Sequence, residues 1–106
     1  SELESMSKNN PSFFNTMIKT FISNSRNDLL MINQHRKNEE WENVGELAHK
    51  MIPSFRHLRI NEMVDLLEEI EELTLRKNDY RGVSDKVHML HYMTNKVIDE
   101  LEKEMI

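Results

Sequence analysis

The sequence contains no cysteine and very few of the residues that interrupt regular backbone: two glycines and two prolines among 106 residues. Without cysteine, the chain cannot form disulfides, iron–sulfur clusters or thiol nucleophiles, and a reducing compartment is expected. Sandwiches, barrels, collagen-like repeats and flexible linkers all need glycine or proline far more often. Helices fit the composition instead, because they favour unbranched apolar side chains inside and charged ones outside. The eight methionines and the 31% of charged residues agree with this interpretation.

The sequence also lacks long apolar runs and clustered positive charge. No apolar stretch approaches the ~20 residues that span a bilayer, and the first ten residues lack the apolar core of a signal peptide. We therefore expect a cytoplasmic location without direct membrane contact. The net charge of −5 argues against nucleic acid as a partner, because its phosphates require clustered lysine and arginine. A protein or a small molecule is the expected partner.

Apolar residues recur at helical spacing in several segments that are separated by short polar turns. The expected helices cover residues 11–37, 39–58, 61–77 and 80 to the C-terminus. The inner stripe expected for the last helix is Val83, Val87, Leu90, Thr94, Val97 and Leu101. Pro11 suits the first turn of the first helix, and Asn61 and Asp79 are expected caps of the third and fourth helices. Amphipathic helices with short connections bury their apolar stripes by packing together. The sequence therefore predicts a polar tail over residues 1–10 and, over residues 11–106, one all-α domain, an antiparallel up-down four-helix bundle.

The second helix carries a histidine between the two disrupting residues that have no role at a helix start. Gly45 lies four residues before His49 and Pro53 four residues after it, and inside a helix they cost about 1 and 3 kcal/mol relative to alanine. Their compact side chains leave the imidazole open on both sides, and Glu46 could accept a hydrogen bond from the ring. The spacing indicates a histidine that another molecule reaches. The alternative is a solvated histidine near a break between two helices.

The run LAHKMIPSFRHL, residues 47–58, resembles the active helix of histidine phosphotransfer (HPt) domains, which reads approximately A-H-x-L-K-G-S-x-x-x-L. Four positions match this pattern: Ala48, His49, Ser54 and Leu58. Ile52 replaces the lysine of the family, Pro53 replaces its glycine, and Arg59 replaces a later glycine. The layout of the helices resembles the family from about residue 12 to residue 105.

The resemblance implies that His49 accepts a phosphoryl group from an aspartyl phosphate on one receiver domain and passes it to another. The chain is then a phosphoryl carrier rather than a stand-alone enzyme. Phosphoryl transfer depends mostly on positioning and charge neutralisation. Because the receiver is expected to bring Mg²⁺, we expect no cofactor or metal on this chain. Ile52 lies beside His49 on a helical wheel, and the residues expected to contact the receiver or to offset the phosphoryl charge are Gly45, Lys50, Ile52, Pro53 and Arg56.

The resemblance also implies the partners, which are receiver domains of response regulators. We expect the isolated domain to be a monomer. Because the sequence does not begin with methionine, it suggests a piece of a longer protein, such as a membrane-anchored hybrid sensor kinase.

Two other interpretations stay open. Glu46-x-x-His49 has the form of the Glu-x-x-His element of di-iron four-helix bundles, and Asp85-x-x-His88 would be a second copy. Such a site also needs inward carboxylates from the other helices, whereas the acidic run of the third helix is interpreted as a solvated outer face: Glu68, Glu69, Glu71 and Glu72. A helical interaction module that has lost phosphotransfer would have the same composition and charge.

Overall fold

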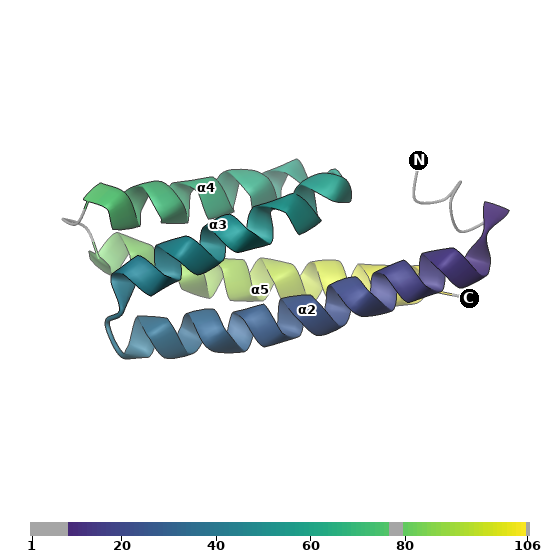
Figure 1. Cartoon of the computed structure of the whole chain (residues 1–106), viewed down its shortest axis with the longest axis horizontal. Coiled ribbons are helices and arrows are strands. Elements are labelled where there is room, and N and C mark those ends of the chain that lie inside the picture. The colour runs from purple at the N-terminus through teal and green to yellow at the C-terminus, as the bar shows by residue number, and fades with distance from the viewer. Residues whose placement is uncertain (1–8, 77–79, 106) are drawn as a thin grey trace.

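The computed structural model describes residues 9–76 and 80–105, and within these residues the helices form a single bundle (Figure 1). The described helices are α2 (Pro11–Lys37), α3 (Trp41–His57), α4 (Asn61–Arg76) and α5 (Tyr80–Glu104). Each runs opposite to the one before it, and α3 packs most extensively against α4. The predicted all-α up-down bundle is confirmed. No described helix has both the length and the apolar character needed to cross a bilayer.

The start of α2 agrees with the prediction for Pro11, and the structure adds a capping side chain that was not predicted. The side-chain oxygen of Asn10 accepts a hydrogen bond from the backbone N–H of Phe13 at 3.1 Å, and Pro11 occupies the first helical position. The prediction that Asn61 caps α4 is wrong, because Asn61 is itself the first helical residue and Ile60 precedes it. The expected tail, apart from residues 9 and 10, and the expected cap at Asp79 lie outside the described residues.

Two residues after the last helical residue of α2 and of α3, the chain has a residue other than glycine in the left-handed region, Glu39 with φ of 57° and Arg59 with φ of 59°. The residue that follows closes each helix with a backbone hydrogen bond, Glu40 N to His35 O at 2.9 Å and Ile60 N to Phe55 O at 3.0 Å. This is the Schellman ending, which more often uses glycine. Because a residue with positive φ cannot continue a right-handed helix, α3 begins at Trp41 rather than near residue 39.

The apolar stripes of the helices meet in one core. Its largest fully buried side chains come from all four described helices: Phe14, Ile18, Ile32, Met51, Phe55, Met63, Leu67, Ile70, Leu90 and Ile98. The α5 stripe differs from the prediction at one place, since Ile98 is buried and Val97 only half-buried. Asp28 interrupts the α2 stripe and is 13% exposed, but its carboxylate lies 3.5 Å from Lys50 Nζ on α3. The polar interruption is therefore satisfied by an ion pair at the edge of the core.

Thr94 on α5 is fully buried, and its hydroxyl has no hydrogen-bond partner among the described residues. Thr94→Val should raise the free energy of unfolding by about 1–2 kcal/mol, because valine keeps the volume and removes the cost of an unsatisfied buried hydroxyl. Thermal unfolding followed by circular dichroism should show an increase in Tm of about 4 °C or more. Thr20→Val, at an exposed position of α2, is the control and should change Tm little. An unchanged Tm in Thr94→Val would contradict the desolvation argument.

Candidate functional site

His49 lies in the middle of α3 on the side that faces solvent, and its side chain is 71% exposed. The opposite side of this helix is buried against the core through Ala48, Met51, Ile52 and Phe55. The helix continues through Pro53, which is exposed one turn after His49. The imidazole is therefore not part of the core, and it is exposed to solvent as the sequence predicted.

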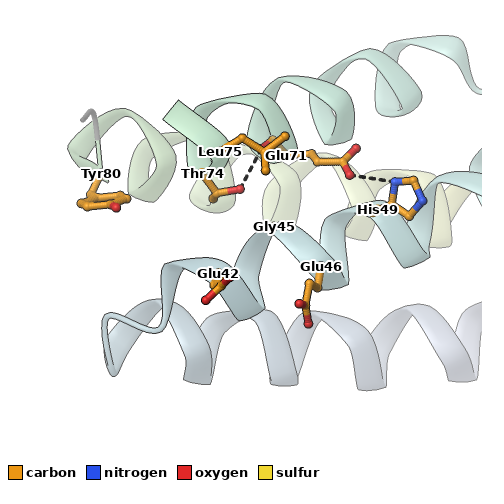
Figure 2. Close-up of a pocket in the computed structure, with 8 residues that line it drawn as sticks. All are labelled: Glu42, Gly45, Glu46, His49, Glu71, Thr74, Leu75 and Tyr80. Carbon is orange, nitrogen blue, oxygen red and sulfur yellow. Dashed lines mark hydrogen bonds and ion pairs between the residues drawn. The ribbon is translucent and has the colours of Figure 1, made fainter. Parts of the chain in front are cut away.

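Glu71 on α4 holds the His49 ring. Its Oε2 lies 2.8 Å from His49 Nδ1, and its side chain is 31% exposed. An ionised carboxylate can only accept hydrogen bonds, so the hydrogen of the neutral ring lies on Nδ1 and the lone pair on Nε2. The second ring nitrogen points away from Glu71 (Figure 2). The dyad of His49 and Glu71 therefore presents the Nε2 lone pair outward.

A close approach of α3 to α4 sets the position of this dyad. Gly45 is buried, and a Cβ placed on it would overlap the Thr74 hydroxyl oxygen and lie 3.1 Å from Thr74 Cβ. The same hydroxyl donates a hydrogen bond to the Glu71 carbonyl at 2.7 Å (Figure 2). The space that the missing Gly45 side chain leaves is therefore occupied by Thr74 of α4, a contact that the sequence did not predict. This contact lets α4 come close enough for the Glu71 carboxylate to reach His49.

Gly45→Ala should destabilise the bundle. Overpacking costs about 1–3 kcal/mol, and the better helix propensity of alanine offsets about 1 kcal/mol of that. Urea unfolding should therefore show a loss of up to about 2 kcal/mol. The helix surface offers a matched control in Asn43→Ala, at an exposed position, which should be neutral or slightly stabilising. Equal stability of Gly45→Ala and the natural protein would mean that Thr74 moves aside without cost.

Two residues predicted at the contact surface lie elsewhere. Ile52 is only 6% exposed, so it belongs to the core and does not form an apolar patch beside His49. The reason is helical spacing, because Ala48, Ile52 and Phe55 follow at i, i+4 and i+7 on one side of α3. Lys50 is exposed, but its ammonium lies beside Asp28 of α2. It therefore neutralises a carboxylate of the fold rather than facing the dyad.

Pro53 and Arg56 do lie on the exposed surface of α3 beyond His49. The Arg56 side chain is 65% exposed, and its guanidinium lies 3.9 Å from a Glu68 carboxylate oxygen. An exposed pair at this distance contributes little to stability, so the guanidinium can turn toward an incoming anion. Of the two lysine and arginine positions predicted to offset phosphoryl charge, Arg56 is the one left available.

The described residues offer no ligand set for the di-iron site that was the alternative interpretation. Among residues 9–76 and 80–105, no group of three or more histidine, aspartate and glutamate side chains lies close enough to hold a metal ion. Glu46 and His49 are on the surface of α3, and Asp85 and His88 are exposed on α5. The Glu-x-x-His spacings therefore reflect surface positions, which cannot face a metal buried in the bundle.

A groove of about 500 Å³ runs along α3 and α4 beside the dyad (Figure 2). It ends at Tyr80, whose ring stacks on Trp41 with centroids 5.0 Å apart. The residues that line it are Glu42, Gly45, Glu46, His49, Glu71, Thr74, Leu75 and Tyr80. The groove therefore places a recessed surface directly next to the His49 ring.

Sequence reasoning missed Glu71 as a site residue. The expected partner of the ring was Glu46 on the same helix, and Glu71 was assigned to a solvated acidic face. In the structure this face is paired, since Glu68, Glu69 and Glu72 contact Arg56, Lys86 and Arg76. No local pattern distinguishes Glu71 from its neighbours. Its contact depends on the register of α4 against α3.

The chain matches one known protein family over most of its length. A family model described as the Hpt domain matches residues 16–104, a span that contains all of α3, α4 and α5 and most of α2. No curated protein and no solved structure shows significant similarity to the chain. The match covers both His49 and Glu71. The chain therefore belongs to the Hpt domain family, whose role is histidine phosphotransfer in phosphorelays.

Proposed function

We propose that His49 is the phosphoacceptor and that it carries a phosphoryl group from the aspartyl phosphate of one receiver domain to the aspartate of another. The observation that carries this proposal is the exposed imidazole with its Nδ1 held 2.8 Å from Glu71 and its Nε2 facing outward. Family membership supports phosphotransfer on a histidine. The geometry supports the choice of this one among the five histidines.

The bonds and charges of the phosphoryl transfer balance with His49, Glu71 and the receiver aspartates alone. The Nε2 lone pair of His49 attacks phosphorus, and the bond from phosphorus to the aspartyl oxygen breaks with its electron pair on the leaving carboxylate. The Nδ1 hydrogen stays in its bond to Glu71, and the charge of that carboxylate offsets the positive charge on the phosphorylated ring. In the return step, a carboxylate of the second receiver attacks phosphorus and the P–N electron pair returns to Nε2.

The partner receiver is expected to supply Mg²⁺ and its own cation for the charge of the transferring group. On this chain, the Arg56 guanidinium is the proposed additional charge, because it lies on the exposed side of α3 two turns beyond His49. Pro53 lies between them and is exposed, which leaves a compact side chain where a receiver would approach. A cytoplasmic location, a monomeric state and an origin in a hybrid sensor kinase stay predictions.

The test is transfer from a panel of purified receiver domains that carry radiolabelled aspartyl phosphate. At least one receiver should label the chain with a base-stable, acid-labile phosphate, and mass spectrometry should place it on residue 49. Addition of a second, unlabelled receiver should remove the label. A label on any other residue would contradict the proposal. If neither the receivers nor phosphoramidate, a chemical donor, labels the chain, the result would instead favour a helical module that has lost phosphotransfer.

A further inference from the structure

The groove beside the dyad combines apolar surface with unpaired negative charge. Leu75 on α4 is 73% exposed, and Tyr80 forms the far end. Glu42 and Glu46 line the α3 side. An exposed leucine and an aromatic ring beside two carboxylates form a surface that suits a side chain with an apolar stem and a cationic end.

Glu42 and Glu46 on α3 differ from the acidic residues of the neighbouring helix α4. In the described part of the chain, neither is paired with a cation, whereas Glu68, Glu69 and Glu71 each have a partner. The two lie one turn apart on α3, where like charges destabilise a helix by a few tenths of a kcal/mol. The helix dipole favours Glu42 in the first turn, but that effect does not extend to Glu46. The position of Glu46 therefore has no stabilising partner among the described residues, and its repulsion with Glu42 is offset only by the favourable position of Glu42.

We propose that this groove selects receiver domains that present a second lysine or arginine side chain about 5–10 Å from the active aspartate, apart from the cation that serves the transferring group. The proposal rests on the assignment of His49 as the phosphoacceptor. Glu46 lies about 4.5 Å and Glu42 about 10.5 Å along the helix axis from His49. A receiver seated over Nε2 therefore reaches the groove and lays the stem of a basic side chain over Leu75 and Tyr80. Its charge then lies at the α3 rim, where the carboxylates of Glu42 and Glu46 point away from Leu75 and toward α2 (Figure 2).

Complementary charge outside the reacting atoms acts mainly on the association rate and on discrimination between partners. The groove should thus affect kcat/KM with a receiver far more than the reactivity of the imidazole itself. Two readouts separate these effects. Transfer from the most active receiver of the panel reports docking, and labelling by phosphoramidate, which has no docking surface, reports the ring.

The experiment compares the double variant Glu42→Gln and Glu46→Gln with a control pair, Glu62→Gln and Glu100→Gln. The control has the same change in charge and lies at a different groove, beyond the α3 to α4 turn. The ratio of receiver transfer to phosphoramidate labelling should fall about tenfold in the groove variant at low salt, and stay unchanged in the control. The salt dependence of receiver transfer should also become weaker in the groove variant.

Each result has a distinct meaning. Equal ratios in the groove variant, the control and the natural protein would overturn the groove proposal and leave His49 as the phosphoacceptor. If phosphoramidate and receivers both fail to label the natural protein, the proposed function itself fails. Circular dichroism melting of both double variants verifies that a lower ratio does not come from unfolding.

Discussion

Replacing His49 with glutamine should remove the phosphohistidine that forms when a phosphorylated receiver is the donor. Glutamine keeps a polar side chain of similar reach, but its amide nitrogen has no lone pair available for attack on phosphorus. Because the side chain is 71% exposed, the free energy of unfolding should change by less than about 0.5 kcal/mol. Acid-labile radiolabel, counted after gel separation, measures the effect directly.

The neighbouring histidine on α3 offers the matched control. His57 is exposed two turns beyond His49, so His57→Gln makes the same chemical change on the same helix. This variant should accept phosphate at the rate of the natural protein. Label that persists in His49→Gln, or that disappears in His57→Gln, would move the phosphoacceptor away from the dyad.

Substitution of Glu71 should lower the rate of transfer while leaving the nucleophile present. In Glu71→Ala the ring loses its partner at Nδ1, so it can rotate and can carry its hydrogen on either nitrogen. Misplacement of a reacting group by about 1 Å can cost about 100-fold, and we expect a loss of about 10- to 100-fold in the single-turnover rate from a receiver. Rapid-quench measurement of phosphoryl transfer provides this rate.

The conservative variant distinguishes positioning from a merely structural role. In Glu71→Gln the amide oxygen still accepts a hydrogen bond from Nδ1. The transfer rate of this variant should therefore be close to that of the natural protein, and lower only by the contribution of the negative charge. Glu72→Ala on the outer side of α4 breaks only an exposed pair with Arg76 and should leave the rate unchanged. If Glu71→Ala transfers at the natural rate, the contact with His49 has no role in orienting the ring.

The helices could be predicted from the sequence because their causes are local. The starts and ends at Pro11 and Lys37 follow from a proline, a capping asparagine and an apolar period that the chain itself carries. The predictions of helix boundaries and buried residues are wrong where contacts or turns outside a single helix determine them. The start of α3 moves to Trp41 because Glu39 adopts a left-handed conformation, and Ile98 replaces Val97 in the core through the packing of α5.

The site was only partly predictable for the same reason. His49 could be found because Gly45 and Pro53 flank it along the chain and because the surrounding residues resemble a known active helix. The roles of those neighbours could not be found in this way. Ile52 lies in the core although a helical wheel placed it beside His49, and Lys50 pairs with Asp28, a residue of another helix.

The scarcity of glycine, proline and cysteine, together with four apolar stripes, determined by itself that this protein is a helical bundle, because helical periodicity and backbone disruption are local properties. It also singled out His49. Only the tertiary structure decided why Gly45 is glycine and which carboxylate holds the ring. The close contact of Gly45 with Thr74 brings Glu71 to His49, and this contact depends on the register of two helices, which neither helix encodes alone.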